Sequence, residues 1–405
     1  MGPNAKAQVI VLGSPKTIAL LTATAFLAAW TLRLRAPGFP FPTPPDGDAS
    51  FTAALSGSTS AMEFPKPEIR FAWAGDFSEG LAPVEVGGRY GWIDTAGAMI
   101  IPARHEGAGP FSCGRAAFQS GGRWGYLDVT GGQAIAPAFA WAGPFREGLA
   151  AVAGDSGFFF IDTAGSRLGR TNFTDARAFS GGFAAVRFGE GENYAWGFID
   201  RAGRLAIDPV FAEAPSGFSE GKARVRIEIE RPWRCGFIDT SGGFVIDTLY
   251  DAAGDFREGL AAVGRGEWQG LVFRGSWGYV DATGRPVIGA HFAEAGPFRD
   301  GLAFVRLESG PWAQIARDGR VVREFRADLD VAEPGEGPMV TYKVRGRRGL
   351  LDPETGAATL PVLSEAGSLR QGWARVRLAG MGGSVWAFVG RDGEWLGGSE
   401  HASAP

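Results

Sequence analysis

The sequence predicts an all-β protein built as a tandem repeat array, and two observations lead to this prediction. Nearly the same run of residues recurs along the chain: residues 77–102 read FSEGLAPVEVGGRYGWIDTAGAMIIP, and similar runs restart at residues 145 and 256. Each copy consists of short apolar runs that stop at glycine, aspartate or proline, which is typical of strands rather than helices. Repetition at a nearly fixed period therefore describes the architecture before any single motif does.

Three anchors define each copy. An aromatic residue precedes a glycine-led apolar run, as Phe77 precedes Gly80. An aromatic-Gly-aromatic-Ile-Asp core follows, as in Tyr90 to Asp94. A turn glycine comes three residues after that aspartate, and successive turn glycines are 34 to 42 residues apart. They are Gly97, Gly131, Gly165, Gly203, Gly242 and Gly284.

Three further copies near the C-terminus are degenerate. They are centred on Trp312, Arg348 and Trp386, and each has lost part of the core motif. Turn glycines still keep the period, so we expect about nine units between residues 71 and 397. Degenerate last units suit an array whose terminal repeats cap the stack.

The repeated core resembles the bacterial WG-repeat family, which is named for a Trp-Gly-Phe-Ile-Asp motif. Six good copies of the core stand in register, and the array covers about four fifths of the chain. The resemblance implies a β-rich repeat domain used for interaction, often in cell-envelope or effector proteins. It implies no catalytic residues.

Each unit is expected to be a three-stranded β-meander. In the first unit, residues 81–86 and 90–94 form a hairpin closed by Gly87-Gly88, and residues 98–102 form the third strand. One such unit cannot bury its aromatic face alone, so neighbouring units must stack. We favour an open superhelical solenoid, because nine units exceed the common number of propeller blades; a closed propeller-like array is the alternative.

The chain begins with an apolar stretch. Residues 17–32 carry no charge and lie between Lys16 and Arg33. As one hydrophobic helix they would span about 24 Å, short of the roughly 30 Å core of a bilayer. We interpret residues 1–35 as an uncleaved signal anchor, with a cleaved signal peptide or a cytosolic segment as alternatives. Residues 36–70 read as a Pro/Ser/Gly-rich linker, and residues 398–405 as a disordered tail.

The composition argues against a nucleic-acid partner, because the net charge is −4 and charged residues make up only 21% of the chain. The one basic cluster, at residues 343–348, reads as a solvated strand face, with contact to an anionic lipid or polymer as the alternative. The three histidines show no metal-ligand spacing, so neither a metal site nor a cofactor is predicted. Cys235 stands at a core aromatic position and is expected to be a small buried side chain.

The recurring aspartates could suggest a cation-binding edge or acid–base catalysis. We instead expect each to cap a turn, because small or polar residues and then glycine follow it. They are Asp94, Asp128, Asp162, Asp200, Asp239, Asp281 and Asp352. The repeated aromatic residues are likewise expected to form the core between units rather than a ligand surface.

The irregular hairpins of units four to six are the best candidate for a binding site. Insertions occupy residues 187–195, 226–234 and 264–276, at the same position of adjacent repeats. Such insertions fall on one face, which is often the binding face; neutral variation of loop length is the alternative. The candidate binding residues are Tyr194, Trp233, Trp268, Arg231, Arg234 and Glu228.

These patterns favour a non-enzymatic interaction scaffold that is membrane-tethered or exported and binds a protein or an envelope polymer through this edge. The alternatives are an enzyme acting on envelope polysaccharide with carboxylates from neighbouring repeats, and a purely structural spacer. No catalytic residue is predicted. We expect inner-membrane anchoring through the N-terminal helix, with the array facing the periplasm, or export; a cytoplasmic location is less favoured.

Overall fold

The computed structural model describes residues 69–397 except 192, 229–232, 271, 309, 326–329, 334–339, 345–346, 352–362, 379–384 and 392–393. All of these belong to one compact part of the chain, residues 62–405. The expected N-terminal helix, nearly all of the linker and the expected tail lie outside the described residues. Within the described ranges, no helix is long and apolar enough to cross a membrane.

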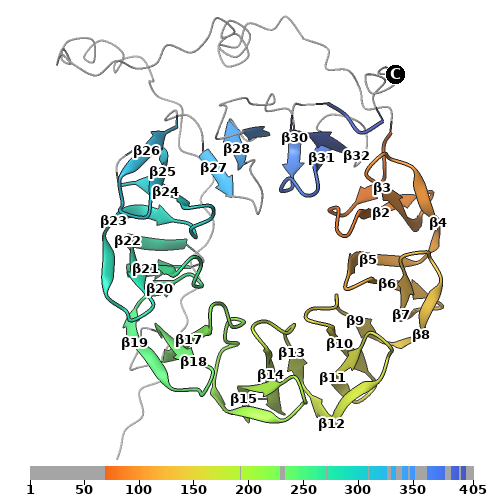
Figure 1. Cartoon of the computed structure of the whole chain (residues 1–405), viewed down its shortest axis with the longest axis horizontal. Coiled ribbons are helices and arrows are strands. Elements are labelled where there is room, and N and C mark those ends of the chain that lie inside the picture. Colours follow the sequence, from red (N-terminus) through yellow and green to blue (C-terminus); the bar gives the residue numbers. More distant parts are fainter. Residues whose placement is uncertain are drawn as a thin grey trace, which may run out of the picture. The chain divides into compact units, whose positions relative to one another are not determined.

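The first unit shows how one copy of the repeat folds (Figure 1). Its central hairpin closes at Gly87 and Gly88. Their φ angles of 60° and 76° lie in the left-handed region, which glycine adopts without strain. The hairpin register runs from Leu81 opposite Asp94 to Val86 opposite Arg89. In sheet order the strands are β1 (Trp73–Ala74), β2 (Leu81–Val86), β3 (Arg89–Asp94) and β4 (Met99–His105).

The next three units repeat this four-stranded sheet. Unit two contains β5 (Gly107–Ser112), β6 (Arg115–Ser120), β7 (Arg123–Asp128) and β8 (Gln133–Phe139). Unit three contains β9 (Trp141–Ala142), β10 (Leu149–Gly154), β11 (Gly157–Asp162) and β12 (Arg167–Phe173). Unit four contains β13 (Asp175–Ala176), β14 (Phe183–Glu190), β15 (Asn193–Asp200) and β16 (Leu205–Phe211).

Units five to seven follow the same plan, and the three main strands of unit six are the longest at ten residues each. Unit five contains β17 (Lys222–Glu228), β18 (Trp233–Asp239) and β19 (Phe244–Tyr250). Unit six contains β20 (Ala252–Ala253), β21 (Leu260–Gln269), β22 (Val272–Asp281) and β23 (Pro286–Ala295). Unit seven contains β24 (Leu302–Leu307), β25 (Trp312–Ala316) and β26 (Val321–Glu324), and β23 joins it to unit six in one sheet.

Units eight and nine share a six-stranded sheet. Unit eight contains β27 (Asp330–Glu333), β28 (Val340–Val344) and β29 (Arg347–Leu351). Unit nine contains β30 (Leu363–Ala366), β31 (Trp373–Leu378) and β32 (Val385–Gly390). The described strands thus fall into nine repeats, which confirms the predicted all-β repeat array.

Most units also have a first strand that the sequence did not predict. β1, β9, β13 and β20 are two residues long, which is too short to produce an alternating pattern. Each pairs with the next strand of its own unit, as Trp73 pairs with Glu85. The predicted three-stranded meander is therefore present, and one short strand is added at its edge.

Aromatic side chains form the core between units. Tyr126 of unit two is fully buried, and its ring centroid lies 4.8 Å from that of Phe145 in unit three. Its hydroxyl donates a hydrogen bond to the Gly143 carbonyl at 2.7 Å, so burial leaves no polar atom unpaired. Tyr279 and Phe298 repeat this arrangement at 4.9 Å. The predicted inter-repeat aromatic core is confirmed.

The last unit contacts the first. Phe71 and Trp386 exchange two backbone hydrogen bonds, each 2.9 Å long, so the start of the array completes the outer edge of unit nine. Phe77 packs on Phe388 at a centroid distance of 4.8 Å. Figure 1 shows β30–β32, in blue, beside β2 and β3, in orange. Of the two arrangements left open by the sequence, these contacts fit the closed, propeller-like one, although each sheet keeps two edges.

The repeated aspartates cap turns, as predicted. Asp94 Oδ1 accepts hydrogen bonds from the amides of Ala96 and Ala98 at 3.0 and 2.8 Å. The same two bonds recur at Asp128, Asp162, Asp200, Asp239 and Asp281. Asp352 lies outside the described residues. Each carboxylate thus stabilises the turn before the fourth strand of its unit.

A second set of polar contacts joins neighbouring units among the first seven. Ser78 donates a hydrogen bond to the Phe111 carbonyl at 2.7 Å, and Glu79 accepts the amides of Cys113 and Gly114 at 2.6 and 2.8 Å. Glu147, Glu220 and Glu258 likewise accept hydrogen bonds from backbone amides of the unit that follows their own. Neighbouring repeats are therefore held by hydrogen bonds at the surface as well as by rings inside.

Candidate functional site

The three long hairpins stand out against the short hairpins of units one and two. In unit six, β21 and β22 pair continuously from Leu260 opposite Asp281 to Gln269 opposite Val272. The hairpins of units four and five end at Glu190 opposite Asn193 and at Glu228 opposite Trp233. In units four and six the insertions are thus extensions of the central hairpin, and in unit five the described residues extend it to the pair of Glu228 and Trp233.

The hairpins of units five and six meet at a guanidinium between two indoles. The Arg226 side chain lies 5.5 Å from the ring centroid of Trp233 and 5.7 Å from that of Trp268. Cation–π contact favours both positions. Arg226 also forms an ion pair with Glu213 at 3.3 Å, so both rings are held by a cation that is itself anchored.

Asp251 contacts both of these hairpins. It is buried, forms an ion pair with Arg234 at 2.8 Å and accepts the amide of Gly266 at 2.9 Å. Its carbonyl accepts the indole N–H of Trp268 at 2.9 Å. We call the group Arg226, Trp233, Arg234, Asp251 and Trp268 the indole cluster.

Trp268 is the exposed member of the indole cluster. Its side chain is 46% exposed although its N–H is hydrogen-bonded, and Phe273 packs against its ring at 5.3 Å. The ring therefore keeps one orientation and still presents apolar surface to solvent. Fixed, exposed aromatic side chains are the usual anchors of protein interfaces.

Tyr194 occupies the neighbouring hairpin of unit four. The Arg187 guanidinium lies 5.1 Å from its ring centroid, and Arg187 Nε donates to the Thr174 hydroxyl at 3.1 Å. Tyr194 is 40% exposed. Its recorded contacts stay within unit four, so it repeats the aromatic–arginine arrangement without joining the indole cluster.

The structure brings three of the six candidate residues together. Trp233, Trp268 and Arg234 belong to the indole cluster, and Tyr194 stands on the adjacent unit. Glu228 ends β17 opposite Trp233, and its side chain is outside the described part. Arg231 lies outside the described residues. These six residues remain predictions as binding residues.

Sequence reasoning missed the two residues that organise the cluster. Arg226 was within the insertion but was not singled out, although its alternation with Glu228 along a strand would have placed both on one face. Asp251 lies in a segment between units, where no repeated motif marks it. Its role follows only from the packing of two units.

The side chains of this region can pack against apolar surface and form hydrogen bonds and ion pairs. In the part of the chain that the structure describes, no group of three His, Cys, Asp or Glu residues could hold a metal ion. Cys235, beside the cluster, is buried as predicted, and burial raises the pKa of its thiol, which keeps the sulfur protonated. The accessible groups are an indole face and arginine side chains already paired with carboxylates.

Comparison with solved structures finds the same type of fold at low sequence identity. A crystal structure of the eukaryotic initiation factor is 13% identical, with 74% of this chain and 88% of that chain covered and a TM-score of 0.50. BamB from Moraxella catarrhalis is 12% identical, with 79% and 97% covered and a TM-score of 0.38. Comparison with curated proteins gave no match.

The repeat itself is recognised by a family profile described as WG containing repeat. It matches residues 68–90, 90–124, 124–153, 196–228, 236–266 and 277–309. The matches stop short of the hairpin extensions of units five and six, since residues 229–235 and 267–276 lie outside them, and they follow the period of the sheets in Figure 1. The chain therefore belongs to the WG-repeat family.

Proposed function

We propose that this protein is a non-enzymatic scaffold that binds a partner protein through the indole cluster. Its β-repeat fold fits a protein-interaction role. The observation that carries the proposal is the exposed face of Trp268, which is held in one orientation by Asp251 and Arg226. A ring that is already ordered loses little conformational entropy on binding.

The composition of the cluster favours a protein partner. Tryptophan and arginine are enriched at the energetically important centres of protein interfaces. The charges of Arg226 and Arg234 are compensated by Glu213 and Asp251, so the surface carries little net charge to attract a charged polymer. A neutral envelope polysaccharide that stacks on the indole is the alternative outcome of the test below.

Photo-crosslinking tests this proposal. A photoreactive phenylalanine analogue would replace Trp268 in one variant and Trp141 in a control, because Trp141 is equally exposed at 45% but lies outside the cluster. We expect a discrete protein adduct from position 268 and none from position 141. Adding Trp233→Ala should remove the adduct. Equal labelling from both positions, or adduct formation that survives Trp233→Ala, would reject the proposal; a glycan adduct would favour the polymer.

A hairpin exchange provides a second test. Arg265 and Ser276 pair as Val86 and Arg89 do in unit one, so replacing residues 266–275 by Gly-Gly recreates that short hairpin. We expect the fold to persist, because the exchange removes only the tip of the hairpin and leaves the core residues of unit six in place. Partner capture should fall at least tenfold. Undiminished capture by a correctly folded exchange variant would place the binding site elsewhere.

We further propose that residues 1–35 tether the array to the inner membrane with the repeats outside the cytoplasm, or direct its export. The basis is the uncharged stretch at residues 17–32 followed by a proline-rich spacer. Protease added to spheroplasts of a bacterial host should then digest the array. Protection of the array until the cells are lysed would place it in the cytoplasm and end this part of the proposal.

A further inference from the structure

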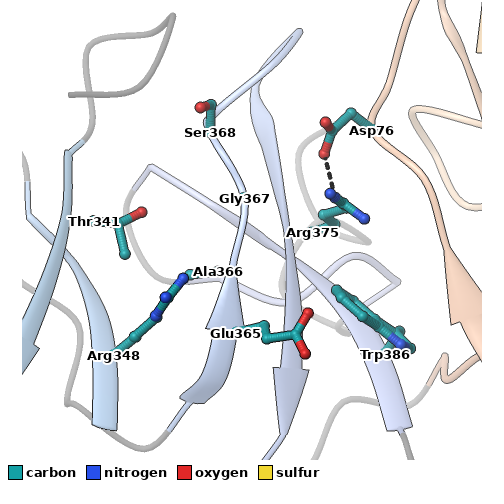
Figure 2. Close-up of a pocket in the computed structure, with 9 residues that line it drawn as sticks. All are labelled: Asp76, Thr341, Arg348, Glu365, Ala366, Gly367, Ser368, Arg375 and Trp386. Atoms are coloured by element: carbon teal, nitrogen blue, oxygen red, sulfur yellow. Dashed lines mark ion pairs between the residues drawn. The ribbon is translucent and has the colours of Figure 1, made fainter. Parts of the chain in front are cut away.

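A polar cavity of about 290 Å³ lies beside the interface that closes the array. Figure 2 shows Arg348 and Thr341 of unit eight on one side, and Trp386 with the Asp76–Arg375 pair on the other. Glu365 of unit nine also lines it. The cavity is therefore built from three units, the eighth, the ninth and the first.

The cavity exists because unit eight departs from the repeat. Arg348 occupies the position before the core glycine, where Tyr90, Trp124 and Trp196 stand in their units. In those units the position holds an aromatic ring, and that of Tyr90 packs on Trp73 at a centroid distance of 5.7 Å. Thr341, which is buried, likewise occupies the position of Ala117 in unit two. An aromatic and an alanine are thus replaced by a guanidinium and a hydroxyl, which leaves polar groups around an unfilled volume.

Both carboxylates that line the cavity form ion pairs with arginines other than Arg348. Asp76 is paired with Arg375 at 2.7 Å, and Glu365 is paired with Arg377 at 2.7 Å. Arg348 is half-buried, and in the described part of the chain no carboxylate lies within ion-pair distance of it. The cavity therefore contains one guanidinium, that of Arg348, with which no carboxylate of the described residues forms an ion pair.

We propose that this cavity binds a carboxylate group through Arg348. A guanidinium holds a carboxylate through two parallel charge-assisted hydrogen bonds. The Thr341 hydroxyl is the second donor at the same wall. A phosphate group would bring more negative charge close to Asp76 and Glu365, so a monoanionic carboxylate suits the site better.

The size of the cavity limits the ligand. Its volume is at the lower end of the range for small-molecule sites, roughly 300–1,000 Å³. It can take a small free carboxylate, or the single acidic side chain of a bound peptide. Trp386, which is largely buried, offers an apolar wall for the carbon atoms of either. This site is separate from the indole cluster and does not depend on the function proposed above.

Saturation-transfer NMR and calorimetry on the full chain test the proposal with two probes. N-acetylglycine is a free carboxylate, and the end-capped peptide Gly-Gly-Asp-Gly-Gly carries only an acidic side chain. We expect saturable binding of at least one probe, and the preferred probe identifies the source. N-acetylglycinamide, which lacks the charge, should not bind. Failure of both acidic probes to bind would overturn the proposal.

Substitutions distinguish binding of the probe at Arg348 from nonspecific electrostatic attraction to the protein surface. Arg348→Gln should weaken binding at least tenfold, because a charge-assisted pair is lost. Arg320→Gln removes an exposed arginine elsewhere and should change nothing. Arg348→Trp restores the aromatic of the other units, so it should fold normally and abolish binding by filling the cavity. Binding that survives Arg348→Trp in a folded protein would overturn the proposal.

Discussion

The ring centroids of Phe77 and Phe388 lie 4.8 Å apart, the same distance that separates Tyr126 from Phe145. The first pair joins residues 311 positions apart, whereas the second joins neighbouring repeats. The interface between the last and the first unit is therefore built like an internal one. A stack of repeats normally ends in two caps; here each end covers the other.

The first prediction concerns the energy of this closing pair. Phe388→Ala should lower the free energy of unfolding by about 3–5 kcal/mol, because it removes a buried ring. Phe198→Ala, at an internal interface, should cost about the same amount. A double-mutant cycle should give a coupling of about 0.5–1.5 kcal/mol between Phe77 and Phe388, measured by urea unfolding. Zero coupling would mean that the ends do not meet in solution.

Sequence reasoning identified the repeated unit because its determinants are local. An aspartate followed by a turn glycine is visible within five residues, and the aromatic core recurs in every good copy. The pairing of Phe71 with Trp386 is different, because no local pattern links two segments so far apart. The indole cluster was half predicted for the same reason: insertions marked Trp233 and Trp268, whereas Asp251 is defined only by packing.

The second prediction concerns the turn before β10 in unit three, which contacts unit four through Glu147. Glu147 has a φ of 53°, a strained value for a residue with a side chain, and its carboxylate accepts the amides of Gly181 and Gly182. Glu147→Ala should lose the hydrogen bonds and keep the strain, at about 1–2 kcal/mol. Glu147→Gly loses the same bonds but relieves the strain, so it should be about 1 kcal/mol more stable than Glu147→Ala. Thermal unfolding of both variants checks this; equal stability would show that the backbone strain is negligible.

The third prediction concerns acid stability. Hydrogen bonds from the hydroxyl two residues on, and from backbone amides, lower the pKa of Asp128, Asp239 and Asp281. A lowered folded-state pKa adds stability above the unfolded value of about 3.9. That stability is lost as the pH falls through the folded-state pKa.

A triple Asp→Asn variant of these residues should therefore lose stability at pH 7 and show a flatter stability profile from pH 5 to pH 2 than the unmodified protein. Urea unfolding at each pH measures the profile. The charge-matched control carries amides at three exposed acids outside the turns, Asp208, Asp247 and Glu324. If the control flattens the profile as much, net charge rather than turn capping is responsible.

The last prediction concerns His105, which is buried at a position where the next unit has Phe139. Its ring lies 5.0 Å from Phe118 and 5.7 Å from Trp92, and its Nε2 has no hydrogen-bond partner. Burial, with a smaller contribution from Arg104, lowers the pKa of His105. The unfolded chain therefore binds this proton more readily than the folded protein does.

Stability should consequently fall as the pH drops below the unfolded pKa of about 6.5, and the loss should level off below the lowered folded-state pKa. His105→Phe restores the residue type of the next unit and should remove this component while preserving the fold. His291→Phe, at an exposed histidine, is the control. Unfolding free energies measured between pH 8 and pH 5 decide the matter: a pH dependence that persists in His105→Phe and disappears in His291→Phe would assign the proton to the other histidine.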